Sequence, residues 1–148
     1  MLESRIRVVI VDDNVEFTAV VEEFLSRQPD MVVMGTAYNG KAAIGLIEEV
    51  HPDVVVLDVV MPHLDGLGVI EYISAAGFVR RPRIVVVSAI GLETTAASIL
   101  AAGADYYLAK PFDLSVLAER IRRLAAIPPD IRLPERPSMP ARTNSFEF

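Results

Sequence analysis

Five short runs rich in valine and isoleucine alternate along this chain with longer stretches of helical periodicity. The runs predict strands at Ile6–Val11, Met31–Ala37, Asp53–Leu57, Arg83–Val87 and Asp105–Ala109. The stretches after them predict helices at Val15–Arg27, Lys41–Val50, Leu67–Ala76, Leu92–Ala102 and Leu114–Ala126. Because strand and helix alternate throughout, the pattern predicts an α/β fold: a doubly wound, five-stranded parallel sheet with five helices.

The first, third and fourth runs are apolar without a break instead of alternating with polar residues. Strands have this composition when helices cover both faces of a parallel sheet. In the first predicted helix, we expect Val20, Val21, Phe24 and Leu25 to face the core. Asp113 stands just before the last predicted helix and is expected to cap it.

The composition fits one folded domain followed by a different kind of segment. The chain has 148 residues, of which 52% are hydrophobic, enough for one domain with a sizeable core. Half of its ten prolines fall after Ile127. Because proline breaks helices and removes backbone donors, we expect a domain at 1–127 and a proline-rich linker or tail at 128–148.

Charge and residue types exclude several functions. The net charge of −6 argues against direct nucleic-acid binding by this segment, and the lack of cysteine excludes disulfides and thiolate metal sites. No apolar run approaches the roughly 18 residues that cross a bilayer, and no signal-peptide pattern is present, so we expect a cytoplasmic protein without membrane contact. The first predicted strand-to-helix turn lacks the glycines of a dinucleotide site.

Asp12, Asp13 and Asp58 each follow the end of an apolar run. The carboxyl ends of parallel strands form the ligand-binding edge of an open sheet. If the first and third strands are neighbours, the three carboxylates lie close together and repel one another unless a hard cation such as Mg²⁺ lies among them. The sequence therefore predicts a cation site.

Two further polar residues are predicted to reach this edge. Ser88 ends the fourth run and Lys110 ends the fifth, and a strand order of 2-1-3-4-5 brings both to the carboxylates. Taken singly, Ser88 would be a hydroxyl satisfied by nearby backbone, and Lys110 would be a surface amine. Together they suit phosphoryl transfer, because a carboxylate can attack phosphorus while a cation, a lysine and a hydroxyl stabilise its oxygens. Asp58 is then the predicted nucleophile, with Asp12 and Asp13 as metal ligands.

Four segments resemble the receiver domain of two-component response regulators. They are Val-Val-Ile-Val-Asp12-Asp13, Val-Leu-Asp58-Val-Val-Met61-Pro62-His-Leu-Asp65-Gly66, Val-Val-Ser88-Ala89 and Ala104-Asp-Tyr-Tyr107-Leu-Ala-Lys110-Pro111-Phe112. The resemblance covers about residues 5–126 and implies a flavodoxin-like fold. Within the family, Asp-Asp-Asn and the loop after Asp58 are most similar to the sporulation master regulators of endospore-forming bacteria.

The resemblance implies a role for each acidic residue. Asp58 would accept a phosphoryl group from a histidine kinase or a histidine phosphotransfer protein. Mg²⁺ would be held by Asp13, Asp58 and the backbone carbonyl of Val60, with Asp12 acting through water.

The resemblance also implies how the domain binds the phosphoryl group and responds to it. Ser88, Ala89 and Lys110 would bind the phosphoryl oxygens, and Ser88 and Tyr107 would form the switch. The Lys110–Pro111 peptide bond would be cis.

These expectations leave three functions open. The leading one is a phosphorylation-dependent switch that controls an output, such as transcription through a domain outside this chain, with dimerisation on phosphorylation as a further expectation. The second is a stand-alone receiver that shuttles phosphoryl groups or binds a protein partner. The third is a metal-dependent phosphohydrolase, which is disfavoured because Val59 and Val60 stand where such enzymes usually carry a second acid.

Val60 and Ile90 lie two positions after Asp58 and Ser88 and are predicted to overhang the phosphorylation site. Being apolar, neither can orient a hydrolytic water, so we predict slow self-dephosphorylation. The double variant Val60→Asn with Ile90→Glu should lose its phosphoryl group faster than the wild type when aspartyl-phosphate decay is followed. Equal decay rates would contradict the prediction.

Overall fold

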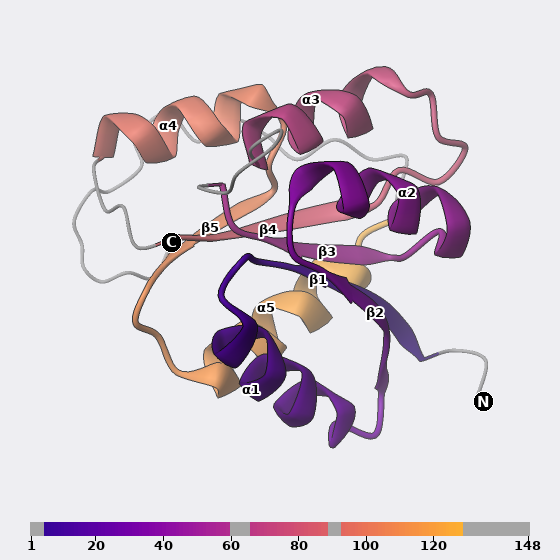
Figure 1. Cartoon of the computed structure of the whole chain (residues 1–148), viewed down its shortest axis with the longest axis vertical. Helices are drawn as coiled ribbons and strands as arrows, with labels where there is room; N and C mark the ends of the chain where they lie inside the picture. Colours follow the sequence, from indigo (N-terminus) through magenta and orange to yellow (C-terminus); the bar gives the residue numbers. More distant parts are fainter. Residues whose placement is uncertain (1–4, 60–65, 89–92, 129–148) are drawn as a thin grey trace.

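The computed structural model describes residues 5–59, 66–88 and 93–128, and these ranges contain five strands and five helices. In chain order (Figure 1) the elements are β1 (Ile6–Val11), α1 (Val15–Ser26), β2 (Met31–Ala37), α2 (Gly40–Val50), β3 (Val54–Leu57), α3 (Gly66–Ala75), β4 (Arg83–Ser88), α4 (Glu93–Ala102), β5 (Tyr106–Ala109) and α5 (Leu114–Ala125). Each predicted element is present, and no end differs from its predicted position by more than one residue.

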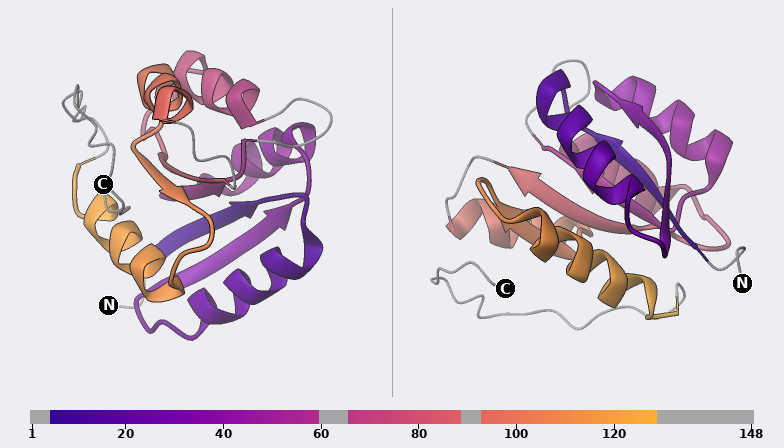
Figure 2. Two further views of the ribbon diagram at one scale, coloured as in Figure 1. Left: turned by 90° about the vertical axis from the view of Figure 1, so that its left-hand side faces the viewer. Right: turned by 90° about the horizontal axis from the view of Figure 1, so that it is seen from below.

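The strands form one parallel sheet in the order β2-β1-β3-β4-β5. Figure 2 shows β1 and β2 side by side and pointing the same way. The predicted doubly wound, flavodoxin-like α/β fold is therefore confirmed. Because all strands run in one direction, their carboxyl ends meet along one edge of the sheet.

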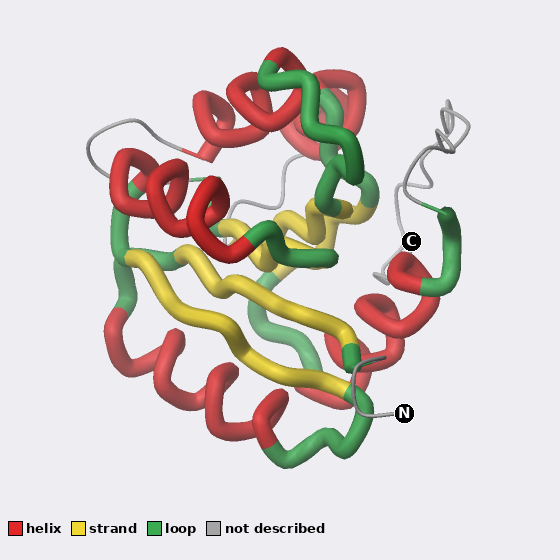
Figure 3. The backbone as a smooth tube through the Cα atoms, turned by 90° about the vertical axis from the view of Figure 1, so that its right-hand side faces the viewer, coloured by secondary structure: helices red, strands yellow, loops and turns green. Residues whose placement is uncertain are grey.

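Two layers of helices enclose the sheet, with α1 and α5 on one face and α2, α3 and α4 on the other (Figures 1 and 3). Successive residues of β1 enter opposite layers: Val8 and Ile10 pack with α1 and α5, whereas Val9 and Val11 pack with α2 and α3. None of the four has exposed surface. Burial on both faces explains why the run is apolar without a break.

The core-facing stripe predicted for α1 is partly wrong. Val20 is 54% exposed and does not face the core, whereas the partly buried Phe24 packs against the core as predicted. The buried residues of the helix are Thr18, Val21 and Leu25. These three residues follow helical spacing, which places them on one face of the helix. The buried hydroxyl of Thr18 donates hydrogen bonds to the carbonyls of Asp12 and Asn14, so a polar residue is tolerated in the stripe.

The helix caps explain where three helices begin. Asn14 and Asn39 cap α1 and α2, because their side-chain oxygens accept hydrogen bonds from the backbone three residues ahead. Asp113 occupies the N-cap position of α5, but its side chain makes no capping hydrogen bond. Its backbone carbonyl instead accepts from the N–H groups of Val116 and Leu117. The predicted side-chain cap is therefore wrong.

Most of the predicted tail, 128–148, lies outside the described residues, so the division of the chain into domain and tail stays a prediction. Among the residues that the structure describes, no helix has the length and hydropathy that crossing a bilayer requires.

Gly66, the first residue of α3, lies against the backbone that follows β3. Its N–H donates to the carbonyl of Val59, and a Cβ placed on it would lie 2.3 Å from the Val59 Cα and 2.4 Å from the Asp58 carbonyl oxygen. Both atoms belong to the backbone and cannot move aside cheaply. Only glycine therefore fits this position without shifting the residues that carry the Asp58 side chain.

Gly66→Ala should lower the free energy of unfolding by about 1–3 kcal/mol, the usual range for overpacking a buried site. Gly45→Ala is the matched control, because Gly45 is exposed in α2 and no atom lies within 4 Å of the place that its Cβ would take. This control should leave stability unchanged or raise it by about 0.5–1 kcal/mol. Urea denaturation measures both. If Gly66→Ala and Gly45→Ala are equally stable, the close backbone contact does not require glycine at position 66.

Candidate functional site

Backbone hydrogen bonds that continue the pattern of the sheet fix the positions of three predicted site residues. The Asp12 N–H donates to Ala37 at the end of β2 over 3.1 Å, and the Asp58 N–H donates to Val11 at the end of β1 over 2.9 Å. The Lys110 N–H donates to Ser88 at the end of β4 over 2.8 Å. Strand pairing therefore fixes the backbone of each residue at one edge of the sheet.

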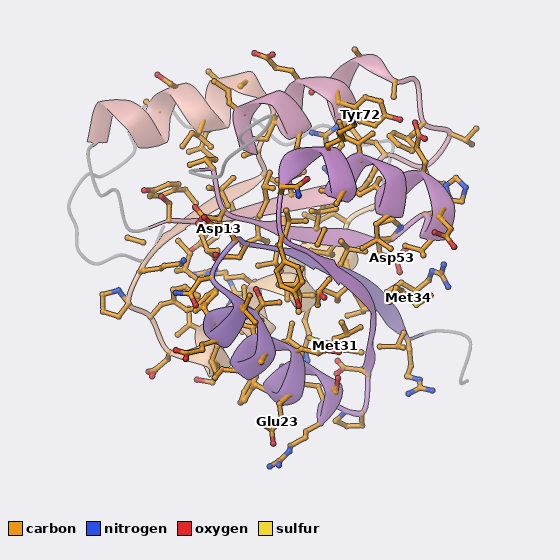
Figure 4. The ribbon with its side chains drawn as sticks, in the orientation of Figure 1. Asp13, Glu23, Met31, Met34, Asp53 and Tyr72 are labelled. Atoms are coloured by element: carbon orange, nitrogen blue, oxygen red, sulfur yellow. The ribbon has the colours of Figure 1, made fainter. Side chains whose placement is uncertain are left out.

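Asp12, Asp13 and Asp58 meet at this edge, each offering a carboxylate oxygen within 4.8 Å of the other two. Asp12 is 1% exposed and Asp58 is 7% exposed, whereas Asp13 is exposed. In Figure 4, Asp13 lies in the loop after β1, and Asp53 lies at the opposite end of the sheet. The structure thus brings the three predicted carboxylates together, away from other acids such as Asp53.

The ammonium group of Lys110 lies within this cluster. Its Nζ is 2.9 Å from Asp12 Oδ2 and 3.8 Å from Asp58 Oδ2, and its side chain is 20% exposed. Three carboxylates and one ammonium carry a formal charge of −2 (−3 plus +1). Buried like charges repel, so this set of groups favours a further positive charge.

A hard divalent cation fits the donor set, since all three acids offer oxygen and the remaining charge is −2. The oxygens of Asp12 are already engaged, one by Lys110 Nζ and the other by the Asn14 N–H at 2.9 Å. All three acids could hold such an ion, and the engaged oxygens of Asp12 suit a contact through water.

The turn after β1 is held by short-range hydrogen bonds. The side chain of Asn14 accepts from the Phe17 N–H at 3.0 Å and so starts α1 directly after the acidic pair. The hydroxyl of Thr18 donates to the Asp12 carbonyl at 3.2 Å from one turn further along the helix. These contacts fix the orientation of the turn that carries Asp12 and Asp13.

Ser88 and Tyr107 form a buried pair close to Asp58. Ser88 has no exposed surface, and Tyr107 is 2% exposed with its ring in the core between the sheet and α2, α3 and α4. Burial raises the pKa of Tyr107 above its ordinary value of 10.0, the charge of Asp58 raises it further, and a hydrogen bond with Ser88 acts in the opposite direction. Ser88 and Asp58 therefore both affect the pKa of the Tyr107 phenol.

The Lys110–Pro111 peptide bond is cis, as predicted. Val60, Ala89 and Ile90 lie outside the described residues, so their predicted roles stay predictions.

Three residues of the site were not predicted from the sequence: Asn14, Thr18 and Phe17. The ring of Phe17 lies 4.1 Å from Lys110 Nζ, measured to the ring centroid. Asn14 carried a usable signal, because asparagine before a helical run is a typical cap. Phe17 carried none, because its contacts with Lys110 and Phe112 join segments far apart in the chain and do not appear in local periodicity. Thr18 carried none, because its partners are backbone carbonyls, which every residue has.

Solved structures with the same fold include the following three chains. The receiver domain of the putative response regulator NarL from Mycobacterium tuberculosis is 29% identical, with a TM-score of 0.79 over 83% of this chain and 98% of that one. The receiver domain of a DNA-binding response regulator from Colwellia psychrerythraea is 26% identical, with a TM-score of 0.75 over 82% and 99%. A chain of the CheX–CheY–BeF3–Mg²⁺ complex from Borrelia burgdorferi is 27% identical, with a TM-score of 0.72 over 80% and 88%.

The family model of the response regulator receiver domain matches residues 8–122, which include Asp12, Asp58, Ser88 and Lys110. The matched range begins within β1 and ends within α5, so it spans almost the whole sheet with its helices. This chain belongs to the response regulator receiver domain family.

Proposed function

We propose that Asp58 accepts a phosphoryl group with the help of Mg²⁺ and that this modification switches the domain between two signalling states. Receiver domains are regulatory phosphoacceptor domains of two-component systems, and they interact with histidine kinases or phosphotransfer proteins. The observation that carries the proposal is a buried Asp58 that shares its edge of the sheet with Lys110 and two further carboxylates.

Asp58 is a better acceptor than either neighbouring acid. Asp12 already accepts hydrogen bonds at both oxygens, and Asp13 is exposed. Lys110 Nζ stands 3.8 Å from Asp58 Oδ2, too far for a direct hydrogen bond but close enough to bind an oxygen of a group attached there.

In the proposed transfer, a carboxylate oxygen of Asp58 attacks the phosphorus of a phosphohistidine. The new P–O bond forms as the P–N bond breaks, and the imidazole nitrogen keeps the bonding electrons and takes up a proton. Lys110 balances charge on the phosphoryl oxygens, and Ser88 donates a hydrogen bond to one of them. Bound Mg²⁺, held by Asp13 and Asp58, would supply further charge stabilisation. The related chain from the complex that contains BeF3 and Mg²⁺ supports this choice of metal.

The output of the switch is proposed to be transcription through a domain outside this chain. The support is a relative that is the receiver domain of a DNA-binding response regulator. The further proposals are a stand-alone receiver, a dimer formed on phosphorylation and a closer relationship to the sporulation master regulators.

Incubation with acetyl phosphate and Mg²⁺ should add the mass of one phosphoryl group to the protein, and Asp58→Asn should abolish the gain. Asp53→Asn is the matched control, because Asp53 lies at the opposite end of the sheet and its replacement keeps an oxygen to accept the Arg7 N–H. Intact-protein mass spectrometry measures all three proteins.

A mass gain that persists in Asp58→Asn would contradict Asp58 as the acceptor. An undiminished gain in excess EDTA would contradict the role of the metal. If Asp53→Asn also fails to gain the mass of a phosphoryl group, the assay responds to loss of folding and not to the identity of the acceptor.

Phosphorylation should change the surroundings of Tyr107 through Ser88. When the Ser88 hydroxyl turns to a phosphoryl oxygen, its hydrogen bond with Tyr107 is lost. In protein labelled with 3-fluorotyrosine, the ¹⁹F signal that Tyr107→Phe removes should shift on phosphorylation. Ser88→Ala should still be phosphorylated but show a much smaller shift, whereas Ser26→Ala, an exposed serine at the end of α1, should behave as wild type. A full shift in Ser88→Ala would contradict this coupling.

A further inference from the structure

The ammonium group of Lys110 contacts an aromatic ring as well as carboxylates. Its Nζ lies 4.1 Å from the centroid of the Phe17 ring, 2.9 Å from Asp12 Oδ2 and 3.8 Å from Asp58 Oδ2. A cation within about 6 Å of a ring centroid, over its face, is attracted by the ring's quadrupole. We propose that Phe17 is a positioning residue that holds Lys110 toward Asp58 and so speeds phosphoryl transfer; the kinetic part rests on the proposed function of Asp58.

Two independent contacts fix Phe17, one through its backbone and one through its ring. Its backbone N–H donates to the Asn14 side chain at 3.0 Å, which sets the first turn of α1. Its ring meets the edge of Phe112, with centroids 6.1 Å apart and planes at 86°. Phe112 lies two residues after Lys110, so the ring bridges the segment after β1 and the segment after β5. These are the two segments that carry Asp12 and Lys110.

A ring suits this position better than a charged or an aliphatic side chain. A carboxylate would bind Lys110 and compete with Asp58, whereas an aliphatic group would exclude water without attracting the cation. The ring face attracts the ammonium group but uses none of its three N–H donors in a conventional hydrogen bond. Lys110 can therefore keep its contact with Asp12 and still donate to a phosphoryl oxygen on Asp58.

The chain itself offers a control for loss of an aromatic side chain. Phe24 lies on the same helix, is likewise partly buried, and packs against the core formed with α1 and α5. The described contacts of Lys110 include the Phe17 ring and not the Phe24 ring. Phe24→Leu therefore reproduces the packing loss of Phe17→Leu without touching the lysine.

The kinetic test uses acetyl phosphate and Mg²⁺ as the phosphodonor system. Phe17→Leu should lower the second-order rate constant of phosphorylation about threefold to tenfold, the factor equivalent to a cation–π attraction of about 0.7–1.4 kcal/mol at 1.4 kcal/mol per tenfold. Phe17→Tyr should retain most of the rate because its ring keeps a negative face. Phe24→Leu should match the wild type.

Pentafluorophenylalanine placed at position 17 separates the quadrupole from packing. This side chain keeps the ring's shape but reverses the sign of its quadrupole, so it should lower the rate at least as much as Phe17→Leu. It also keeps the proposal falsifiable if Phe17→Leu does not fold. A wild-type rate in this variant would overturn the proposal.

A second readout does not depend on phosphorylation. The chain contains two lysines, Lys41 and Lys110, so protein labelled with ¹³C-lysine gives two sets of side-chain signals. In the wild type, the ε-CH₂ protons of Lys110 should be shifted upfield of those of exposed Lys41 by the ring current of Phe17. The shift should disappear in Phe17→Leu and persist in Phe17→Tyr.

The two readouts distinguish the possible failures. If the wild type shows the ring-current shift but takes up no phosphoryl group on Asp58, the proposed function fails while the contact stands. If the wild type is phosphorylated and Phe17→Leu matches it in rate, the positioning role fails. If the signals of Lys110 resemble those of Lys41, the contact itself is wrong.

Discussion

The close contact between Lys110 and Asp12 links the acidic and basic groups of the site. Asp12 is 1% exposed and Lys110 is 20% exposed, and a charge as far from water as that of Asp12 is costly unless it has close compensation. The contact joins the ends of β1 and β5, which are separated by β3 and β4 in the sheet. It therefore depends on the complete strand order, and the hydrogen bonds of Asn14 and Thr18 serve to hold its acidic half in place.

Lys110 offsets only part of the negative charge of the site, and the proposed switch uses the charge that remains. One ammonium among three carboxylates leaves a formal charge of −2. Lys110 pairs with Asp58 at 3.8 Å, a distance too long for a direct hydrogen bond. A phosphoryl group on Asp58 would offer Lys110 and Ser88 a further acceptor with negative charge. Ser88 also forms a hydrogen bond with the buried phenol of Tyr107. If a phosphoryl group draws the Ser88 hydroxyl away, the contacts of Tyr107 in the core under α4 would change.

The sequence predicted most of this architecture, and the failures have two causes. Unbroken apolar runs identified β1, β3 and β4 because burial on two faces leaves no polar position in a strand. The carboxylates, Ser88 and Lys110 were predictable because each directly follows such a run. Val20 and Phe17 were not, since their exposure and contacts depend on how α1 packs against segments far away in the chain. The side-chain cap expected from Asp113 failed because the Val116 N–H, which such a cap could bind, donates to the Asp113 backbone carbonyl.

The most direct test of the account is the chemical identity of the modified residue. After reaction with acetyl phosphate and Mg²⁺, reduction with borohydride converts an aspartyl phosphate into homoserine, which peptide mass spectrometry can locate. The account predicts homoserine at position 58 and aspartate at positions 12 and 13. Homoserine at either of those positions, or at none of the three, would contradict it.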